Sequence, residues 1–202
     1  MNDLLEKIGE ALARQKKADR VTLCTQIAPV EEGRFFLFEG DGNRAYAVAS
    51  QEKVQSGADY LIVHVSEAAL QTAFVAVDHC LIKDRDSLSG RRCDVALSWN
   101  SILAFLDLKL NTTNIAPGLK TAESFHKQMK STLEYFQNYL GIPLNTYELR
   151  IYIVFPAATI TTTMGAERLR FESDIFDIFG LNAEYFLVPD TPSYGLTPEL
   201  RL

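Results

Sequence analysis

The chain has 202 residues, of which 47% are hydrophobic and 23% are charged, a composition typical of one globular domain with a real core. No hydrophobic run approaches the roughly 18 residues of a membrane span, and the N-terminus lacks the continuous apolar stretch of a signal peptide, so we expect a cytoplasmic protein with no membrane partner. The net charge of −6 argues against broad, nonspecific nucleic-acid binding, which depends on phosphate neutralisation by Lys and Arg. It does not exclude a local basic patch.

The cysteines favour a reduced compartment. Cys24, Cys80 and Cys93 are odd in number and show no CxxC spacing, which predicts buried thiols rather than a disulfide framework. The three histidines form no HxH or HExxH pair, so a zinc site is not expected.

The first half of the chain alternates helical and strand patterns. An amphipathic helix is expected over residues 1–18, capped by Asn2 or Asp3, because its leucines and isoleucine recur on one side. Strong turn residues at 40–43 separate two β-rich runs and predict a hairpin. In chain order we expect this hairpin at 34–50, a strand at 58–65, a short helix at 66–71 and a strand at 73–82.

The second half begins with two apolar strands at 93–98 and 101–110, joined by a tight turn at Trp99 and Asn100. A helix is expected at 121–140, because hydrophobic residues recur there at helical spacing and Gly141 follows. A β-branched and aromatic strand at 147–156 comes next. Beyond it we expect short strands at ATITTT and RLRFES, ambiguous segments at SDIFDIFGL and EYFLVP, and a proline-rich terminal coil.

Three charged residues interrupt the apolar strand pair: Asp94, Asp107 and Lys109. Strand side chains alternate faces, so Asp107 and Lys109 point the same way. With a two-residue turn at Trp99 and Asn100, Asp94 lies one diagonal step from Asp107, and diagonal neighbours are roughly 7–8 Å apart at the backbone. The two carboxylates are therefore expected to reach one ion.

Two chemical interpretations of these charges remain open. Two unpaired carboxylates on one face repel each other, and Mg²⁺ would remove that conflict, because it takes carboxylate, water and phosphate oxygens. A nearby lysine can assist the attacking water in metal-assisted phosphodiester hydrolysis. The alternative is a solvated strand face on which Asp107 and Lys109 simply neutralise each other.

Asp94, a 12-residue gap and then Asp107-x-Lys109 resemble the core motif of the PD-(D/E)xK, or restriction-endonuclease-like, nuclease superfamily. The resemblance covers residues 60–156 and implies an α/β fold: a mixed central sheet with flanking helices, ordered helix, three-strand meander, helix, strand. We expect a single domain at 1–202, with an N-terminal helix and hairpin extension at 1–57 and a C-terminal extension at 157–202.

The resemblance also assigns roles within the site. Mg²⁺ or Mn²⁺ would be held by Asp94 and Asp107, and Lys109 would be catalytic. The substrate would be nucleic acid, with DNA favoured, in prokaryotic defence or DNA processing. Cys93 stands where the motif has proline, and the QxxxY variant of some members is absent. The further candidates are the Leu108 carbonyl as a third metal ligand, Glu67 as an acid of the first helix and Gln128 or Lys127 as a polar residue of the second.

Basic residues flank the motif on both sides, and we interpret them as phosphate contacts. A solvated loop and an ordinary helical ion pair between Lys130 and Glu134 are the alternatives. A second functional hypothesis is a noncatalytic protein-interaction module or a degenerate nuclease-like subunit; it leaves open a homodimer or a protein partner. The candidate nucleic-acid contacts are Arg85, Arg91, Arg92, Lys127 and Lys130.

Overall fold

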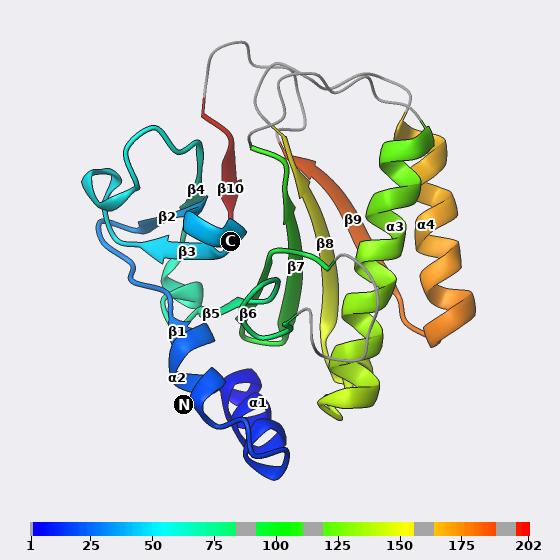
Figure 1. The fold of residues 1–202 in the computed structure, drawn as a ribbon. Coiled ribbons are helices and arrows are strands. Elements are labelled where there is room, and N and C mark those ends of the chain that lie inside the picture. Colours follow the sequence, from blue (N-terminus) through cyan, green and yellow to red (C-terminus); the bar gives the residue numbers. More distant parts are fainter. Residues whose placement is uncertain (1, 84–91, 111–118, 156–163, 189–196) are drawn as a thin grey trace.

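The computed structural model describes residues 2–83, 92–110, 119–155, 164–188 and 197–202 (Figure 1). They form an α/β protein with two mixed sheets, which confirms the predicted fold class at that level. The six-stranded sheet has the order β1-β5-β6-β7-β8-β9 and the four-stranded sheet the order β10-β4-β2-β3.

The strands of the large sheet are β1 (Thr25–Ile27), β5 (Ala73–Ala76), β6 (Val95–Trp99), β7 (Ile102–Leu108), β8 (Glu148–Val154) and β9 (Ala183–Val188). Those of the small sheet are β2 (Arg34–Glu39), β3 (Ala45–Val48), β4 (Tyr60–His64) and β10 (Glu199–Arg201). The α-helices are α1 (Asp3–Arg14), α2 (Asp19–Cys24), α3 (Leu119–Glu134) and α4 (Met164–Phe179).

The large sheet combines an antiparallel meander with a parallel half. Strands β5, β6 and β7 pair antiparallel, whereas β7, β8 and β9 run parallel. Parallel neighbours need a crossover connection, and α3 and α4 follow β7 and β8 in the chain. The helical pattern at 121–140 is thus confirmed: α3 passes into a π-helical turn at Tyr135–Tyr139.

Helices α3 and α4 cover one face of the large sheet, side by side (Figure 1). The Phe105 ring of β7 packs edge-on against Phe136, with 5.0 Å between ring centroids. The Tyr185 ring of β9 contacts Phe125 of α3 and Phe171 of α4. These contacts bury the helix-facing side of the sheet, and β7 is buried along almost its whole length, as expected of a strand covered on both faces.

The terminal segments complete both sheets. β1 pairs with β5, and β10, which was expected to be coil, pairs parallel with β4. The hydrophobic core runs continuously through both sheets and α1. α1 buries Leu4, Ile8 and Leu12 and is capped by the Asn2 side chain, which accepts from the Leu4 N–H. The helix ends at Arg14 rather than at residue 18.

Three predicted elements differ from the structure, two of them in length or helix type. β5 ends at Ala76, and the chain then turns through residues 77–82, where His79 has a positive φ of 56°. RLRFES belongs to α4 and is not a strand, because Phe171 and Ile175 bury one helical face. The short helix at 66–71 is only a 3-10 turn, Glu67–Ala69. The segment ATITTT, at 158–163, lies outside the described residues.

The cysteine prediction is also corrected. Cys24 and Cys80 form a disulfide that joins the end of α2 to the turn after β5, and only Cys93 is a free, buried thiol. Because the two bonded residues are 56 positions apart, spacing alone carried no signal for their pairing. Among the described helices, none is long and apolar enough to cross a membrane.

Candidate functional site

The β6–β7 hairpin sets the register of the candidate site. Trp99 pairs with Ile102, so the turn consists of Asn100 and Ser101, one residue later than predicted. Asn100 adopts the left-handed φ of 50° that such tight hairpin turns require. The last regular pair is Val95 with Leu106, and Phe105 pairs with Ala96 rather than with Asp94 as expected.

Asp94 closes this ladder with its side chain. The Asp94 N–H donates to the Leu106 carbonyl at 3.0 Å, and the Leu108 N–H donates to Asp94 Oδ2 at 2.5 Å. Burial raises the pKa of the Asp94 carboxyl well above its usual range, and the neighbouring charge of Asp107 raises it further. The carboxyl is thus held in place at a position where a negative charge is unfavourable without a cation.

Asp107 and Lys109 form a partly buried ion pair. The Asp107 side chain is fully buried, and its Oδ1 lies 2.8 Å from the Lys109 Nζ. By strand alternation Asp107 shares the side of β7 that carries Phe105, whose ring packs against Phe136 at the end of α3. The pair predicted between Asp107 and Lys109 therefore exists, but not on a solvated face.

A third carboxylate, Glu39 at the end of β2, approaches the site from the small sheet. Burial raises the pKa of Glu39, while the Lys109 ammonium lowers it and Asp107 raises it. The negative charge of Glu39 also raises the pKa of the Asp94 carboxyl. Nothing in the sequence around Glu39 indicates this approach, because it depends on how the two sheets pack.

Helix α3 positions the residues that precede Asp94. The Cys93 N–H donates to Thr132 Oγ1 at 3.0 Å, and Gln128 Nε2 donates to the Arg92 carbonyl at 3.4 Å. Arg92 is 3% exposed and lies 3.6 Å from Asp78. Arg92 was predicted to contact phosphate; the structure shows its side chain buried and paired with Asp78. Gln128 thus binds the backbone carbonyl of Arg92, two residues before Asp94, and not the Asp94 side chain.

Glu67 does not join the site. It lies exposed on the 3-10 turn before β5, and β5 begins with Ala73, which pairs with Ser98 at the far end of β6 from Asp94. The structure does not bring Glu67 beside the two aspartates; an acid from outside the motif that raises the pKa of Asp94 is Glu39.

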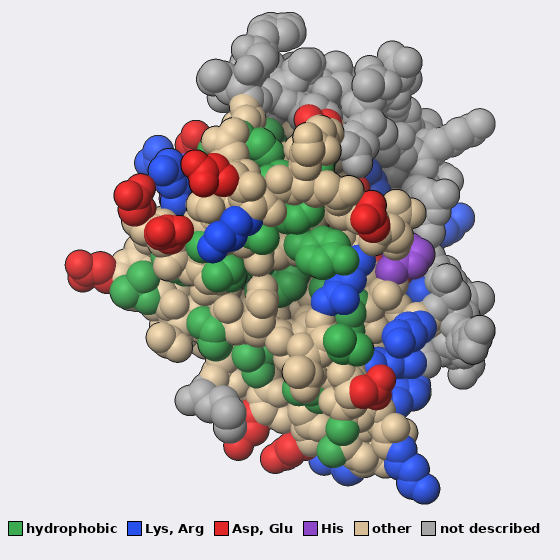
Figure 2. Space-filling view, turned by 60° about the vertical axis from the view of Figure 1, so that its left-hand side comes forward, with side chains coloured by type: hydrophobic (Ala, Val, Ile, Leu, Met, Phe, Trp, Pro, Cys, Tyr) green, Lys and Arg blue, Asp and Glu red, His purple; other side chains and the backbone are tan. Residues whose placement is uncertain are grey.

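The predicted basic patch is only partly described. Lys127 is exposed on α3, whereas Lys130 pairs with Asp174 of α4 at 3.0 Å rather than with Glu134. Arg85 and Arg91 lie outside the described residues. Figure 2 brings the small-sheet side forward and shows acidic side chains over its left and upper parts, with Lys and Arg side chains along its right edge. This face thus carries both signs of charge.

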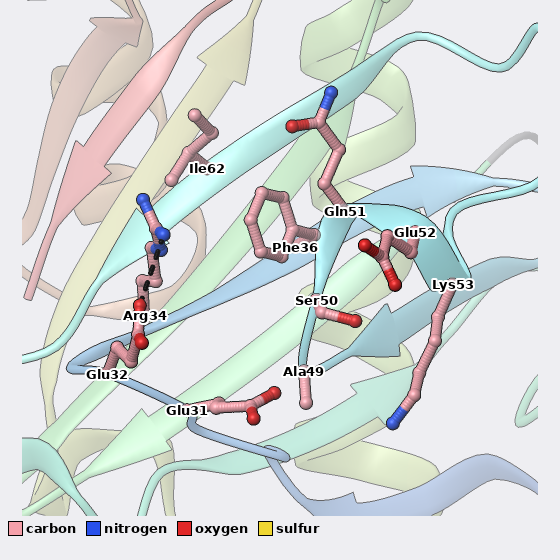
Figure 3. A pocket seen from close by; sticks show the side chains of 10 residues that line it. All are labelled: Glu31, Glu32, Arg34, Phe36, Ala49, Ser50, Gln51, Glu52, Lys53 and Ile62. Carbon is pink, nitrogen blue, oxygen red and sulfur yellow. Dashed lines mark hydrogen bonds and ion pairs between the residues drawn. The ribbon is translucent and has the colours of Figure 1, made fainter.

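A pocket of about 520 Å³ lies on the small sheet (Figure 3). Phe36 and Ile62 form its apolar part, and Arg34 at its side pairs with Glu32 at 3.4 Å. It lies at the start of β2, whereas Glu39 and the aspartate site lie at the end of that strand. The remaining lining residues are Glu31, Ala49, Ser50, Gln51, Glu52 and Lys53.

The donor set at the aspartate site suits a hard cation with few protein ligands. In the ranges that the structure describes, no three His, Cys, Asp or Glu side chains are grouped so that they could hold a metal ion. Asp94 and Asp107 alone match Mg²⁺, which commonly keeps several waters and binds one or two carboxylates plus substrate phosphate oxygens. The Leu108 N–H donates to Asp94 Oδ2. The role of the Leu108 carbonyl as a third metal ligand stays a prediction.

Comparison with known proteins supplies no family for this arrangement: no family model, no curated protein and no solved structure matches the chain.

Proposed function

We propose that this protein is a metal-dependent phosphodiesterase that acts on nucleic acid, with DNA as the favoured substrate and a restriction-endonuclease-like core. The observation that carries the proposal is the convergence of Asp94, Asp107 and Lys109 at one end of the β6–β7 hairpin. Asp94 and Asp107 would hold Mg²⁺ or Mn²⁺, and Lys109 would act at the attacking water.

The order of elements around the site supports this proposal. The antiparallel strands β5, β6 and β7 are followed by α3 and then by β8, parallel to β7. This is the meander, helix and strand that the resemblance implies. The site lies near the end of β7, and in mixed α/β sheets the carboxyl ends of parallel strands are common sites of ligand binding.

The electrostatics also favour a cation at this position. Burial and Asp107 make the charged form of Asp94 unfavourable, so a divalent cation between the two carboxylates would recover free energy that the empty pair lacks. When bound, the metal would polarise a phosphoryl oxygen and lower the pKa of a bound water. The Leu108 N–H would keep the Asp94 carboxyl oriented by its bond to Oδ2.

A cleavage assay tests the assigned roles. Purified protein is incubated with single- and double-stranded DNA and with RNA, in Mg²⁺, in Mn²⁺ and in EDTA. We expect metal-dependent cleavage that falls by about 10²-fold or more in Asp107→Asn and Lys109→Met, the usual range for loss of a catalytic acid–base group. The matched control is Asp3→Asn with Lys7→Met, which removes another carboxylate–ammonium pair, 2.7 Å apart, far from the site.

Binding of the metal provides a second readout. Addition of Mg²⁺ or Mn²⁺ should raise the melting temperature of the wild type by preferential binding to the folded state, and Asp94→Asn should abolish that increase. Equal cleavage by the wild type and the Lys109 and Asp107 variants would show that the assigned roles are wrong.

A noncatalytic binding module is the second candidate, and one observation favours it. The Lys109 ammonium already faces the buried Asp107 carboxylate, so the charges at the site balance in part without a metal. For such a module we expect a folded protein that neither cleaves nucleic acid nor gains stability from Mg²⁺ or Mn²⁺. A melting shift without cleavage would instead indicate a metal site without catalysis.

A further inference from the structure

Helix α4 exposes hydrophobic side chains on the surface that faces away from the sheet. Phe171 and Ile175 are fully buried against the protein, whereas Leu169 is 68% exposed and Phe176 is 54% exposed. Leu169 and Phe176 are seven residues apart, so they lie on one side of the helix, with the exposed Ser173 between them. We call Leu169, Ser173 and Phe176 the outer stripe of α4.

No described helix or strand packs over the outer stripe. α4 lies at the edge of the helix layer, with α3 on one side of it (Figure 1). Lys130 of α3 pairs with Asp174, and Glu172 accepts from the Tyr185 N–H of β9, so these two contacts tie the flanks of α4 to the protein. Single exposed hydrophobic side chains are common on protein surfaces, so what indicates an interaction surface here is the set of charges beside Leu169 and Phe176.

The charges beside the stripe indicate what would cover it. Arg170 and Asp177 are exposed, lie on the same flank of the stripe and are also seven residues apart. Neither forms an ion pair with another described residue. If two copies of α4 packed antiparallel, Arg170 of each would lie near Asp177 of the partner subunit, whereas a parallel twofold pair would place the two charged flanks on opposite sides of the interface.

We propose that a second copy of this chain packs on the outer stripe, with the two α4 helices antiparallel about a twofold axis near Ser173. Leu169 of one protomer packs against Phe176 of the partner subunit, and the small Ser173 lets the helices approach closely. The two Arg170–Asp177 pairs fix the direction. A twofold interface uses the same patch on both subunits, and the charged flank of this stripe is complementary to itself.

The interface is small, so the association is weak. α4 has 16 residues, which is about 24 Å of helix, and one helix pair buries less than the roughly 800 Å² per partner of a standard stable interface. We therefore expect a dissociation constant on the order of micromolar or weaker. The proposal does not depend on the proposed nuclease function.

Sedimentation equilibrium of the full chain, from micromolar to millimolar concentration, tests the proposal. The wild type should show a monomer–dimer equilibrium, and Phe176→Lys should shift it at least tenfold towards monomer. The control is Leu23→Lys, which changes another exposed leucine, 55% accessible, and should leave the equilibrium unchanged. Circular dichroism confirms that each variant is folded.

Charge reversal tests the direction of packing. Arg170→Asp and Asp177→Arg should each weaken dimerisation, and the double variant should restore it. A mixture of the two single variants should form heterodimers, since one carries two acids and the other two bases on the flank. Any of three results would overturn the proposal: a wild type that is monomeric at all concentrations, a dimer that Phe176→Lys leaves intact, or no recovery in the double variant. A monomeric wild type would indicate that the stripe binds a different protein.

Discussion

A buried carboxylate must be neutralised, protonated or bound to a cation, and Asp107 shows the first of these states. Its side chain is fully buried and faces the ammonium of Lys109, which is 24% exposed. The sequence pattern brought these two residues and Asp94 together correctly, because alternation within a strand and pairing across a tight turn are local rules. Glu39 and the Asp78–Arg92 pair were missed, because their contacts join segments that are distant in the chain.

The ion pair leads to a prediction about stability. Lys109→Met removes the cation that faces a buried carboxylate, which should lower the free energy of unfolding by about 3 kcal/mol, the lower end of the range for broken buried pairs. Asp107→Asn combined with Lys109→Met should recover part of that loss, since no charge then remains at either position. Urea unfolding of the wild type, both single variants and the double variant gives the coupling energy. Strictly additive effects would contradict the pairing.

At the scale of elements, the best-predicted segments have a complete local signal. The β6–β7 hairpin, α3 and β8 all appear near their expected positions, since each has its own periodicity and stop residues. The turn was misplaced by one residue because Trp99, an aromatic residue, extends the strand. RLRFES was misjudged because only the packing of Phe171 and Ile175 against the rest of the protein identifies its helical face.

The docking of α1 gives a pH-dependent prediction. Asp3 accepts hydrogen bonds from Lys7 and from Tyr147, and these bonds lower the pKa of Asp3 below its usual value of 3.8. A lowered carboxyl pKa adds stability above the unfolded-state pKa, and this is lost as the pH falls through the folded-state value.

Asp3→Asn should therefore destabilise the protein slightly at neutral pH, by a few tenths of a kcal/mol for so exposed a group. The difference should shrink below the usual carboxyl pKa and disappear as the pH falls through the lowered folded-state pKa of Asp3. Urea unfolding of the wild type and Asp3→Asn along a pH series measures it. A deficit that stays constant down to the lowest pH would assign the effect to something other than the charge of Asp3.

For the whole molecule, the disulfide is the longest-range covalent constraint. Cys24 and Cys80 are 56 positions apart and enclose β1 to β5. Closing a loop of that length restricts the unfolded chain by about 4 kcal/mol in the chain-entropy model. Cys24→Ala with Cys80→Ala should lower the free energy of unfolding by roughly that amount, and urea unfolding measures the change. A reducing agent should destabilise the wild type but leave this variant unaffected.

The sequence by itself determined the α/β class, the helix at α3 and the convergence of Asp94, Asp107 and Lys109 at one end of a hairpin. Hydrophobic periodicity and strand alternation act over a few residues, so they can be read without a fold. Only the tertiary structure decided that Cys24 bonds to Cys80, that β10 joins β4, that Arg92 is buried and that Glu39 lies near the aspartates. Each of these joins residues that are distant in the chain, and their proximity depends on the packing of the two sheets.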